Sequence, residues 1–247
     1  MEDIKIFNNY KYYPVLLNLH NKDVIIVGGG KVAARKLKTL INTGARIKII
    51  SPEFCEKIDR ISKQHPQKIT LIRRKYKYGD LKDCVLVIAA SSDETCQKII
   101  HKEAQEKNIL INTVNNLELC DFIVPSNIFL DDLTISISTQ GKTPAISRLI
   151  RKRLESEIIP SYVLLIEFAG ELRDYIKQNI NEDEIRHKLL KKLAEPKLIE
   201  WIEKNKWDKI ESWTYKLLNM EEHTRYIKAL VKRLKERAKS LTKVNLE

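Results

Sequence analysis

The sequence lacks long apolar runs and contains few cysteines. None of its 247 residues fall in a run of about 20 apolar residues, so no segment predicts a membrane-spanning helix. The four cysteines (Cys55, Cys84, Cys96 and Cys120) are widely spaced and form no C-x-x-C pair, which excludes a disulfide framework and a zinc ribbon. An apolar fraction of 43% is too high for a disordered chain. We therefore expect a soluble cytoplasmic protein with reduced thiols and no membrane partner.

Several chemical signatures are also missing. The five histidines show no metal-ligand spacing, so we predict no metal site, and the sequence contains neither a G-x-S-x-G motif nor a P-loop lysine. The net charge of +12 and the pI near 9.4 are compatible with nucleic acid, phosphate-bearing cofactors, polycarboxylate substrates, or a generally basic protein with none of these. No helix-turn-helix, zinc finger or aromatic RNA-binding strand is recognisable, so we expect no nucleic-acid partner.

The first half of the sequence alternates strand-sized and helical apolar patterns. Strands are predicted over residues 23–27, 45–50, 69–72, 84–90 and 109–111, with helices over 31–43, 53–64 and from Ser92 or Asp93 to Glu106. Such alternation indicates an α/β fold with a Rossmann-like parallel sheet that is covered on both faces. We predict that this domain spans residues 1–113.

The pattern changes after the α/β domain. Two strands, over 122–125 and 133–138, follow without an intervening helix, and we assign residues 114–147 to a small β-rich section. From Pro144 onward the pattern is helical, with breaks at Pro160 and Pro196. We therefore predict an all-helical C-terminal domain over residues 148–247.

Three of the seven glycines are consecutive. The segment Gly28-Gly29-Gly30-Lys31-Val32-Ala33 fits G-x-G-x-x-A, directly after the first predicted strand and at the start of a helix. Gly28 permits a tight turn, Gly30 lets the backbone approach a pyrophosphate, and Ala33 lets the helix pack close to the sheet. The N–H groups at the helix start, around Lys31 and Val32, are then free for phosphate oxygens. We favour a dinucleotide site over a purely structural glycine turn.

The second predicted strand has no acidic residue at its end. Ser51, Pro52 and Glu53 follow the strand; Ser51 can hydrogen-bond the adenosine ribose, and Glu53 can reach it. Arg46 and Lys48 lie inside the strand and are not placed to bind a 2′-phosphate. The sequence therefore favours NAD over NADP as cofactor.

Small residues close the strand predicted over 84–90. Ala89, Ala90 and Ser91 would let a nicotinamide ring or its ribose approach the backbone. A simple helix cap by Ser92 or Asp93 explains the same segment equally well and does not exclude the first interpretation.

Taken together, these segments resemble the precorrin-2 dehydrogenase family, the NAD-dependent enzymes of sirohaem synthesis, some of which are also sirohydrochlorin ferrochelatases. The resemblance covers about residues 10–157 in colinear order, in the segments 13–19, 27–36, 88–90, 112–114, 122–126 and 138–144, with Arg148, Leu154 and Glu155. It implies oxidation of precorrin-2 to sirohydrochlorin with hydride transfer to NAD⁺, followed in some members by insertion of Fe²⁺. It also implies a Rossmann domain, a β-rich dimerisation section, a helical C-terminal part and a homodimer.

The resemblance further implies where the tetrapyrrole binds. The family's serine-rich loop corresponds to Ser138, Thr139, Gln140 and Gly141, which would line the tetrapyrrole cleft, and Val114 would lie at the cofactor. Lys142 and Arg148 can meet substrate carboxylates, although on their own they are better explained as a turn and a solvated helix face.

The sequence departs from the family at one functional position. The family's aspartate follows the N-x-V segment, where this chain has Asn115. An amide does not take up a proton near neutral pH, so Asn115 cannot act as a general base, and Asp121 can substitute only if the loop folds back. In order of preference, the chain still dehydrogenates, has lost chelation, or has become a non-catalytic homologue that binds a tetrapyrrole or a nucleotide.

Overall fold

The first half of the chain folds into a five-stranded parallel sheet, as the alternating pattern predicted. A computed structural model describes residues 11–157, 159–218 and 223–244. The strands are β1 (Asp23–Val27), β2 (Arg46–Ile50), β3 (Ile69–Ile72), β4 (Leu86–Ala89) and β5 (Leu110–Thr113), in the order β3-β2-β1-β4-β5. The strand order reverses between β1 and β4, and ligands of such sheets bind beyond the carboxyl ends of the strands at this point.

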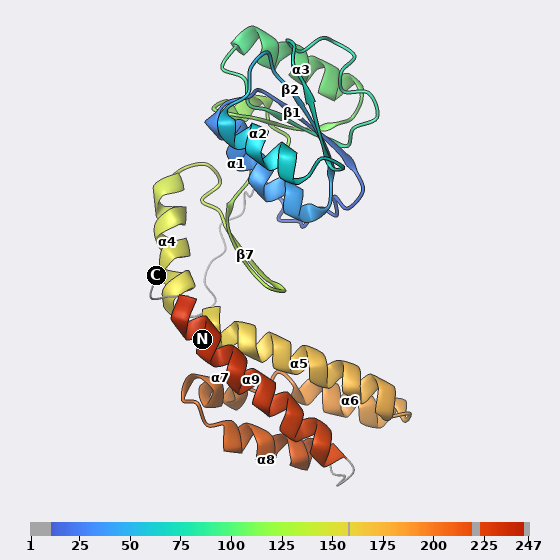
Figure 1. Ribbon diagram of the computed structural model, residues 1–247, viewed down its shortest axis with the longest axis vertical. Coiled ribbons are helices and arrows are strands. Elements are labelled where there is room, and N and C mark those ends of the chain that lie inside the picture. The colour runs from blue at the N-terminus through green and yellow to red at the C-terminus, as the bar shows by residue number, and fades with distance from the viewer. Residues whose placement is uncertain (1–10, 158, 219–222, 245–247) are drawn as a thin grey trace. The chain divides into compact units, whose positions relative to one another are not determined.

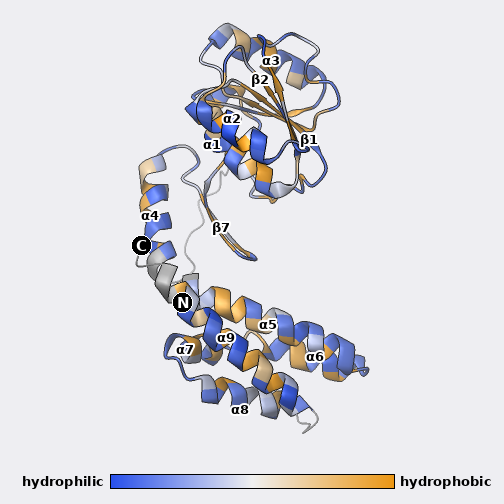
Figure 2. Cartoon of the chain, in the orientation of Figure 1, coloured by the Kyte–Doolittle hydropathy of each residue, from blue (hydrophilic) through white to orange (hydrophobic). Residues whose placement is uncertain are grey.

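Helices cover both faces of this sheet. Helix α1 (Lys31–Leu40), which continues into the short 3-10 helix η1 (Ile41–Thr43), and α2 (Glu56–Gln64) pack on one face, and α3 (Glu94–Glu106) packs on the other (Figure 1). The strands are mostly apolar because both faces of the sheet are covered, and Figure 2 shows them largely in the hydrophobic colour. Asp93 caps α3 by accepting a hydrogen bond from Cys96 N at 3.1 Å, as predicted.

The prediction of a strand over 122–125 was wrong. The strand β6 spans Ser126–Leu130 and pairs in antiparallel register with β7 (Leu133–Ile137). Pro125 has no N–H to donate, and the carbonyl of Phe122 accepts a hydrogen bond from Asn112 Nδ2 at 2.9 Å, which holds the preceding segment beside β5. An unpredicted short 3-10 helix, η2 (Leu117–Leu119), lies between β5 and that segment.

The remainder of the described chain is helical, as predicted. The helices are α4 (Pro144–Glu157), α5 (Ile159–Asn179), α6 (Asp183–Lys192), α7 (Pro196–Glu203), α8 (Trp207–Leu218) and α9 (Thr224–Val244). Pro196 is the first residue of α7, where the missing N–H has no intrahelical partner to lose, and Pro160 lies in α5. Buried residues of α5, including Phe168 and Leu172, share a core with Ile227 and Leu230 of α9.

The chain divides into two compact units. One unit holds residues 1–124 and 140–142, and the other holds 125–139 and 143–247, so the β6–β7 hairpin belongs with the helices. The division at residues 113 and 147 stays a prediction. Within the described ranges, no helix is both long and apolar enough to cross a bilayer.

Candidate functional site

The turn after β1 brings the carboxyl ends of three strands together. Gly28 has a φ of +121°, and a Cβ there would lie 2.6 Å from the carbonyl oxygen of Ala90 at the end of β4. Its N–H donates to Ile50 O of β2 at 2.9 Å, while Ala90 N donates to Val27 O at 2.8 Å. The predicted role of Gly28, a tight turn without a side chain, agrees with this geometry.

Gly29 has a structural role that the sequence motif does not assign. A Cβ on Gly29 would lie 1.8 Å from the carbonyl oxygen of Glu53 and 2.8 Å from Ser51 Oγ. Cys55 N also donates to Gly29 O at 2.8 Å. The loop after β2 therefore packs directly on the glycine turn, and only glycine fits at position 29.

Gly30 faces open space. Its φ of −86° and ψ of −170° suit any residue, and a Cβ there would meet no atom within 4 Å. It is the N-cap of α1 without a side-chain hydrogen bond, and the first turn of α1 carries no acidic residue. The first N–H groups of the helix, from Lys31 onward, have no intrahelical partner and offer a positive dipole end. The space at Gly30 is therefore open to an anionic group such as a pyrophosphate.

Ala33 closes the other side of this turn. Ala33 and Ala34 are fully buried against the sheet, whereas Lys31 is exposed and Val32 is half-buried. A larger side chain at position 33 would push α1 away from β1 and β4. The helix N-terminus is thus held close to the strand ends, as the motif predicted.

The loop after β2 forms one end of the candidate site. Ser51 is buried and its N–H donates to Ile72 O at 3.1 Å, while Pro52 and Glu53 are exposed. Because its oxygen lies beside Gly29, Ser51 is positioned at the glycine turn, as a ribose ligand would need to be. Arg73, which no sequence motif marks, follows β3 next to this loop.

The loops after β4 and β5 form the other end. Ala89 is fully buried, and its carbonyl accepts a hydrogen bond from Val114 N at 2.9 Å. Gln97 of α3, which no sequence motif marks either, donates through Nε2 to Ser91 O at 2.7 Å and to Val114 O at 3.4 Å. One buried amide therefore joins two of the predicted cofactor-binding segments.

Asn115 lies at the carboxyl end of β5. It is exposed, and its φ of +64° is in the left-handed region, which Asn tolerates better than most residues. Thr113 N donates to the sulfur of Cys120 at 3.1 Å, and Thr113 Oγ1 donates to Leu119 O at 3.0 Å, so the loop folds back along β5. The predicted catalytic position therefore lies on a loop fixed at both ends.

Asp121 lies away from the carboxyl end of β5. Its N–H donates to Ile111 O at 2.9 Å, and its carboxylate accepts hydrogen bonds from Ile111 N at 3.0 Å and from Gln105 Nε2 at 3.1 Å. The loop does fold back, but it places Asp121 beside the middle of β5, about 7 Å along the strand from its end. The carboxylate is occupied by the strand edge and does not take the place of the missing aspartate.

Burial shifts the pKa values of two side chains beside this loop, Cys120 and Lys36. Burial raises the pKa of the Cys120 thiol, so the thiol form is favoured. Burial also lowers the pKa of Lys36 on α1; repulsion from Arg35 adds to this, and Cys120 opposes it. The α1 side of the β5 loop is therefore a partly dehydrated environment.

The predicted substrate residues are split between the two units. Gly141 has a φ of +85° and packs on Leu117, where a Cβ would be 2.9 Å from Cδ1, so residues 140–142 lie by the loop that carries Asn115. Thr139 Oγ1 instead accepts hydrogen bonds from Thr143 N at 3.1 Å and Ser147 Oγ at 3.4 Å, and thus fixes the start of α4. Lys142, Arg148 and Ser138 are all exposed.

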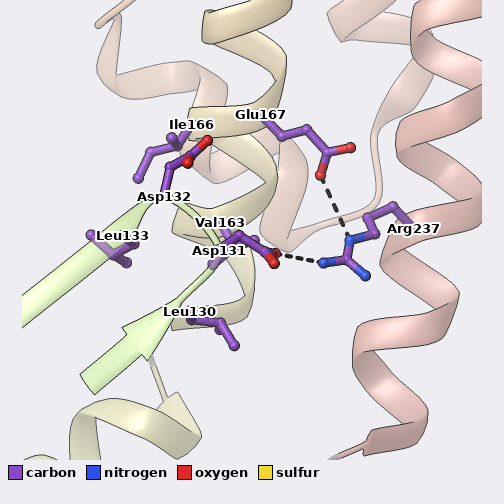
Figure 3. Close-up of a pocket in the computed structure, with 8 residues that line it drawn as sticks. All are labelled: Leu130, Asp131, Asp132, Leu133, Val163, Ile166, Glu167 and Arg237. Atoms are coloured by element: carbon purple, nitrogen blue, oxygen red, sulfur yellow. Dashed lines mark hydrogen bonds and ion pairs between the residues drawn. The ribbon is translucent and has the colours of Figure 1, made fainter. Parts of the chain in front are cut away.

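A pocket of about 340 Å³ lies in the second unit and is separate from the glycine turn. Figure 3 shows it between the β6–β7 turn, α5 and α9. The guanidinium of Arg237 forms ion pairs with Asp131 and Glu167 at its wall. The lining is acidic (Asp131, Asp132 and Glu167), so the pocket does not suit an anionic cofactor.

The chain is similar to known proteins over both units. Residues 15–126 match the family described as "Putative NAD(P)-binding", and residues 131–157 match the family described as "Sirohaem biosynthesis protein central". Siroheme synthase from Nitrosomonas europaea is 35% identical over 175 residues, which cover 71% of this chain and 37% of that protein. Siroheme synthase from Nitrosospira multiformis is 30% identical over 212 residues, which cover 85% of this chain and 45% of that protein.

The fold also matches a solved structure. "SirC, precorrin-2 dehydrogenase" superposes with a TM-score of 0.69 at 21% identity, over 90% of this chain and 100% of that one. This likeness confirms the predicted architecture: a Rossmann-like sheet, a small antiparallel β section and a helical C-terminal part. The chain spans less than half the length of the two siroheme synthases.

Proposed function

Since the chain matches the families described as "Putative NAD(P)-binding" and "Sirohaem biosynthesis protein central", we propose that it belongs to the sirohaem synthase family and oxidises precorrin-2 to sirohydrochlorin with NAD⁺. The substrate loses a hydride and a proton, and the products are sirohydrochlorin, NADH and H⁺. The observation that carries the proposal is the open space at Gly30, which lies at the helix N-terminus and between the loops after β2 and β4.

The glycine turn and its neighbours would hold the cofactor, which accepts the hydride when bound. The first-turn N–H groups of α1 bind the pyrophosphate, with Lys31, Val32 and Ala33 forming that turn. Ser51 and Pro52 border the adenosine ribose. The backbone of Ala89, Ala90, Ser91 and Val114, joined through Gln97, borders the nicotinamide half.

The tetrapyrrole would lie beyond the carboxyl end of β5. Gly141 and Lys142 lie in the same unit as Asn115, and Lys142 offers an exposed cation to a substrate that carries carboxylates. Ser138, Thr139 and Arg148, which the sequence also predicts for the substrate, lie in the other unit and stay a prediction. Precise placement of a substrate against the nicotinamide supplies most of the rate enhancement in hydride transfer, so dehydrogenation does not require a carboxylate at position 115.

Metal insertion is the weaker half of the family's chemistry in this chain. The pyrrole nitrogens must lose protons as the metal enters, and the Asn115 amide cannot accept them. The carboxylate of Asp121 is held by Ile111 and Gln105 and does not replace it. We therefore place ferrochelatase activity second to dehydrogenation, and treat Fe²⁺ as a substrate of that reaction.

A second candidate function is binding without chemistry. Asn115 is the observation that favours it, because the family's functional aspartate is missing while the glycine turn is intact. Such a homologue would bind NAD⁺ or a tetrapyrrole and turn neither over.

We also propose that the protein is a cytoplasmic homodimer. The side chains of Ile146, Leu149 and Ile150 on α4 are 46%, 64% and 41% exposed, and Phe129 on β6 is 59% exposed, so this unit presents an apolar surface that a second copy would cover. All four cysteines are free thiols, as is usual in a reducing compartment.

An anaerobic assay tests the proposal. Purified protein is mixed with precorrin-2 and NAD⁺, and sirohydrochlorin is followed by the change in its chromophore together with NADH absorbance. We expect equal amounts of both products, and the addition of Fe²⁺ or Co²⁺ separates metal insertion from oxidation. Binding of NAD⁺ and precorrin-2 without product would establish the second candidate instead.

A further inference from the structure

Arg73 lies at the carboxyl edge of the sheet beside the loop after β2. Ile50 and Ile72 are paired in the parallel register of β2 and β3, and Ser51 N donates to Ile72 O at 3.1 Å. Ser51 and Arg73 are therefore the first residues beyond two neighbouring strand ends, and neighbouring strands are about 4.8 Å apart. Ser51 also touches the glycine turn, since its Oγ lies 2.8 Å from a Cβ built on Gly29.

The guanidinium of Arg73 is positioned by two contacts. Its Cζ lies 5.0 Å from the centre of the Phe54 ring, and Phe54 belongs to the same loop as Ser51. Its Nη2 donates to Asp59 Oδ1 at 3.0 Å, in a pair whose side chains are 59% and 34% exposed. Such an exposed pair is weak, and a guanidinium has five N–H donors, so Arg73 can bind a further anion.

The two other arginines on or next to β2 and β3, Arg74 and Arg46, are less suited than Arg73 to bind an anion at this edge of the sheet. The guanidinium of Arg74 binds Asp80 through two hydrogen bonds of 2.6 and 2.7 Å, and its Nη1 also donates to Lys75 O. Arg46 is at the opposite end of β2, where it pairs with Asp23. At position 51, where dinucleotide sites that bind NAD usually have a carboxylate, this chain has a hydroxyl that can donate to a phosphate.

We propose that Ser51 and Arg73 form a subsite for the 2′-phosphate of the adenosine ribose, so that the site binds NADP⁺ as well as NAD⁺. The inference rests on the proposed function only in that the glycine turn must hold a dinucleotide. Arginine binds phosphate with two parallel N–H groups, and the Phe54 ring attracts the guanidinium without neutralising its charge. Glu53 is the carboxylate in this loop that opposes an added phosphate, and it limits the preference for NADP⁺.

Calorimetric titration of the full chain with NAD⁺, NADP⁺ and 2′,5′-ADP tests the subsite without any turnover. We expect NADP⁺ to bind within about tenfold of NAD⁺. Arg73→Ala should weaken the binding of NADP⁺ and of 2′,5′-ADP by about tenfold or more, as expected for the loss of a charged hydrogen bond. The affinity for NAD⁺ should stay within about twofold of the wild-type value. Glu53→Gln should strengthen NADP⁺ relative to NAD⁺. The matched control Arg46→Ala removes an arginine from the far end of β2 and should change none of these affinities.

The outcomes separate the subsite from the proposed function. If NAD⁺ binds and NADP⁺ does not, or if Arg73→Ala weakens both to the same degree, the 2′-phosphate subsite is wrong and the dehydrogenase proposal stands. If neither dinucleotide binds while the protein unfolds cooperatively on heating, the glycine turn is not a cofactor site and both proposals are wrong.

Discussion

The carbonyl oxygen of Glu53 packs on Gly29 so closely that a Cβ at position 29 would lie 1.8 Å from it. A Cβ at the adjacent Gly30 would have no atom within 4 Å. The two neighbouring glycines therefore have different surroundings. Gly29 is required by the protein's own loop, whereas at Gly30 only the dinucleotide of the proposed function would require glycine.

Alanine substitutions at these two positions should therefore have opposite effects. Gly29→Ala should lower the free energy of unfolding by about 3 kcal/mol, because the methyl group overlaps a main-chain carbonyl. Gly30→Ala should leave stability unchanged or raise it by up to about 1 kcal/mol, because its backbone angles suit alanine. The same variant should weaken the binding of NAD⁺ by about tenfold or more, which corresponds to at least ~1.4 kcal/mol of binding free energy. Urea unfolding measures the effect on stability, and NAD⁺ titration measures the effect on affinity. Equal NAD⁺ affinities for wild type and Gly30→Ala would contradict the proposed pyrophosphate site at Gly30.

Glu103 fixes the loop between β3 and β4. Its side chain is fully buried on α3 and accepts hydrogen bonds from Tyr76 OH at 2.5 Å, Gly79 N at 2.7 Å, Leu81 N at 3.1 Å and Lys107 Nζ at 2.6 Å. Glu103→Gln should cost about 3 kcal/mol at pH 7, because the amide replaces an acceptor by a donor among four donors. Glu106→Gln, on the same helix but exposed, is the control and should change stability by less than about 0.5 kcal/mol.

The Glu103 effect should depend on pH. Burial alone would raise the pKa of Glu103, but the hydrogen bonds from Lys107, Tyr76 and the two main-chain N–H groups outweigh it and lower that pKa. A carboxyl with a lowered pKa stabilises the fold above its unfolded value of about 4.3, and this contribution is lost as the pH falls through the folded value. The stability difference between wild type and Glu103→Gln should therefore shrink between pH 5 and about pH 3. A difference that stays constant would show that packing, not charge, is responsible.

Local patterns predicted most of the α/β half of the fold. The strands over 23–27 and 69–72 were predicted residue for residue, because a short β-branched run bounded by turn residues leaves few alternatives. The strand predicted over 122–125 was wrong, since its apolar residues serve a loop that folds back along β5. Sequence spacing does not indicate that return.

The candidate site was predicted only where its residues are close in sequence. The motif around Gly28 and Gly30 carries its own spacing, whereas the contact between Gly29 and Glu53 joins segments 24 residues apart. Gln97 and Arg73 are ordinary polar residues of a helix and a strand end, and only the folded arrangement shows what they reach. The position of Asp121 beside β5 is likewise a tertiary property.

The proposed dimer should be sensitive to one charge on α4. Leu149 is 64% exposed, so Leu149→Glu should change the free energy of unfolding of a monomer by less than about 0.5 kcal/mol. Within a dimer interface the same carboxylate would be buried without a partner, so the variant should elute as a monomer in size exclusion with light scattering. Ile185→Glu, on the exposed side of α6, is the matched control and should leave the dimer intact. A Leu149→Glu dimer of unchanged stability would place the interface elsewhere.

Restoring a carboxylate at position 115 distinguishes the functions left open by the sequence. Asn115→Asp should fold normally, because aspartate tolerates a φ of +64° nearly as well as asparagine. If hydride transfer depends on placement, the variant should change dehydrogenation by less than about threefold, while Co²⁺ insertion should rise by about a hundredfold, as for a restored general base. Asn116→Asp adds the same charge one residue away, where the side chain accepts a hydrogen bond from Glu118 N, and should change neither rate. A large gain in dehydrogenation with Asn115→Asp alone would instead show that the wild-type chain binds without catalysis, because the base would then limit oxidation itself.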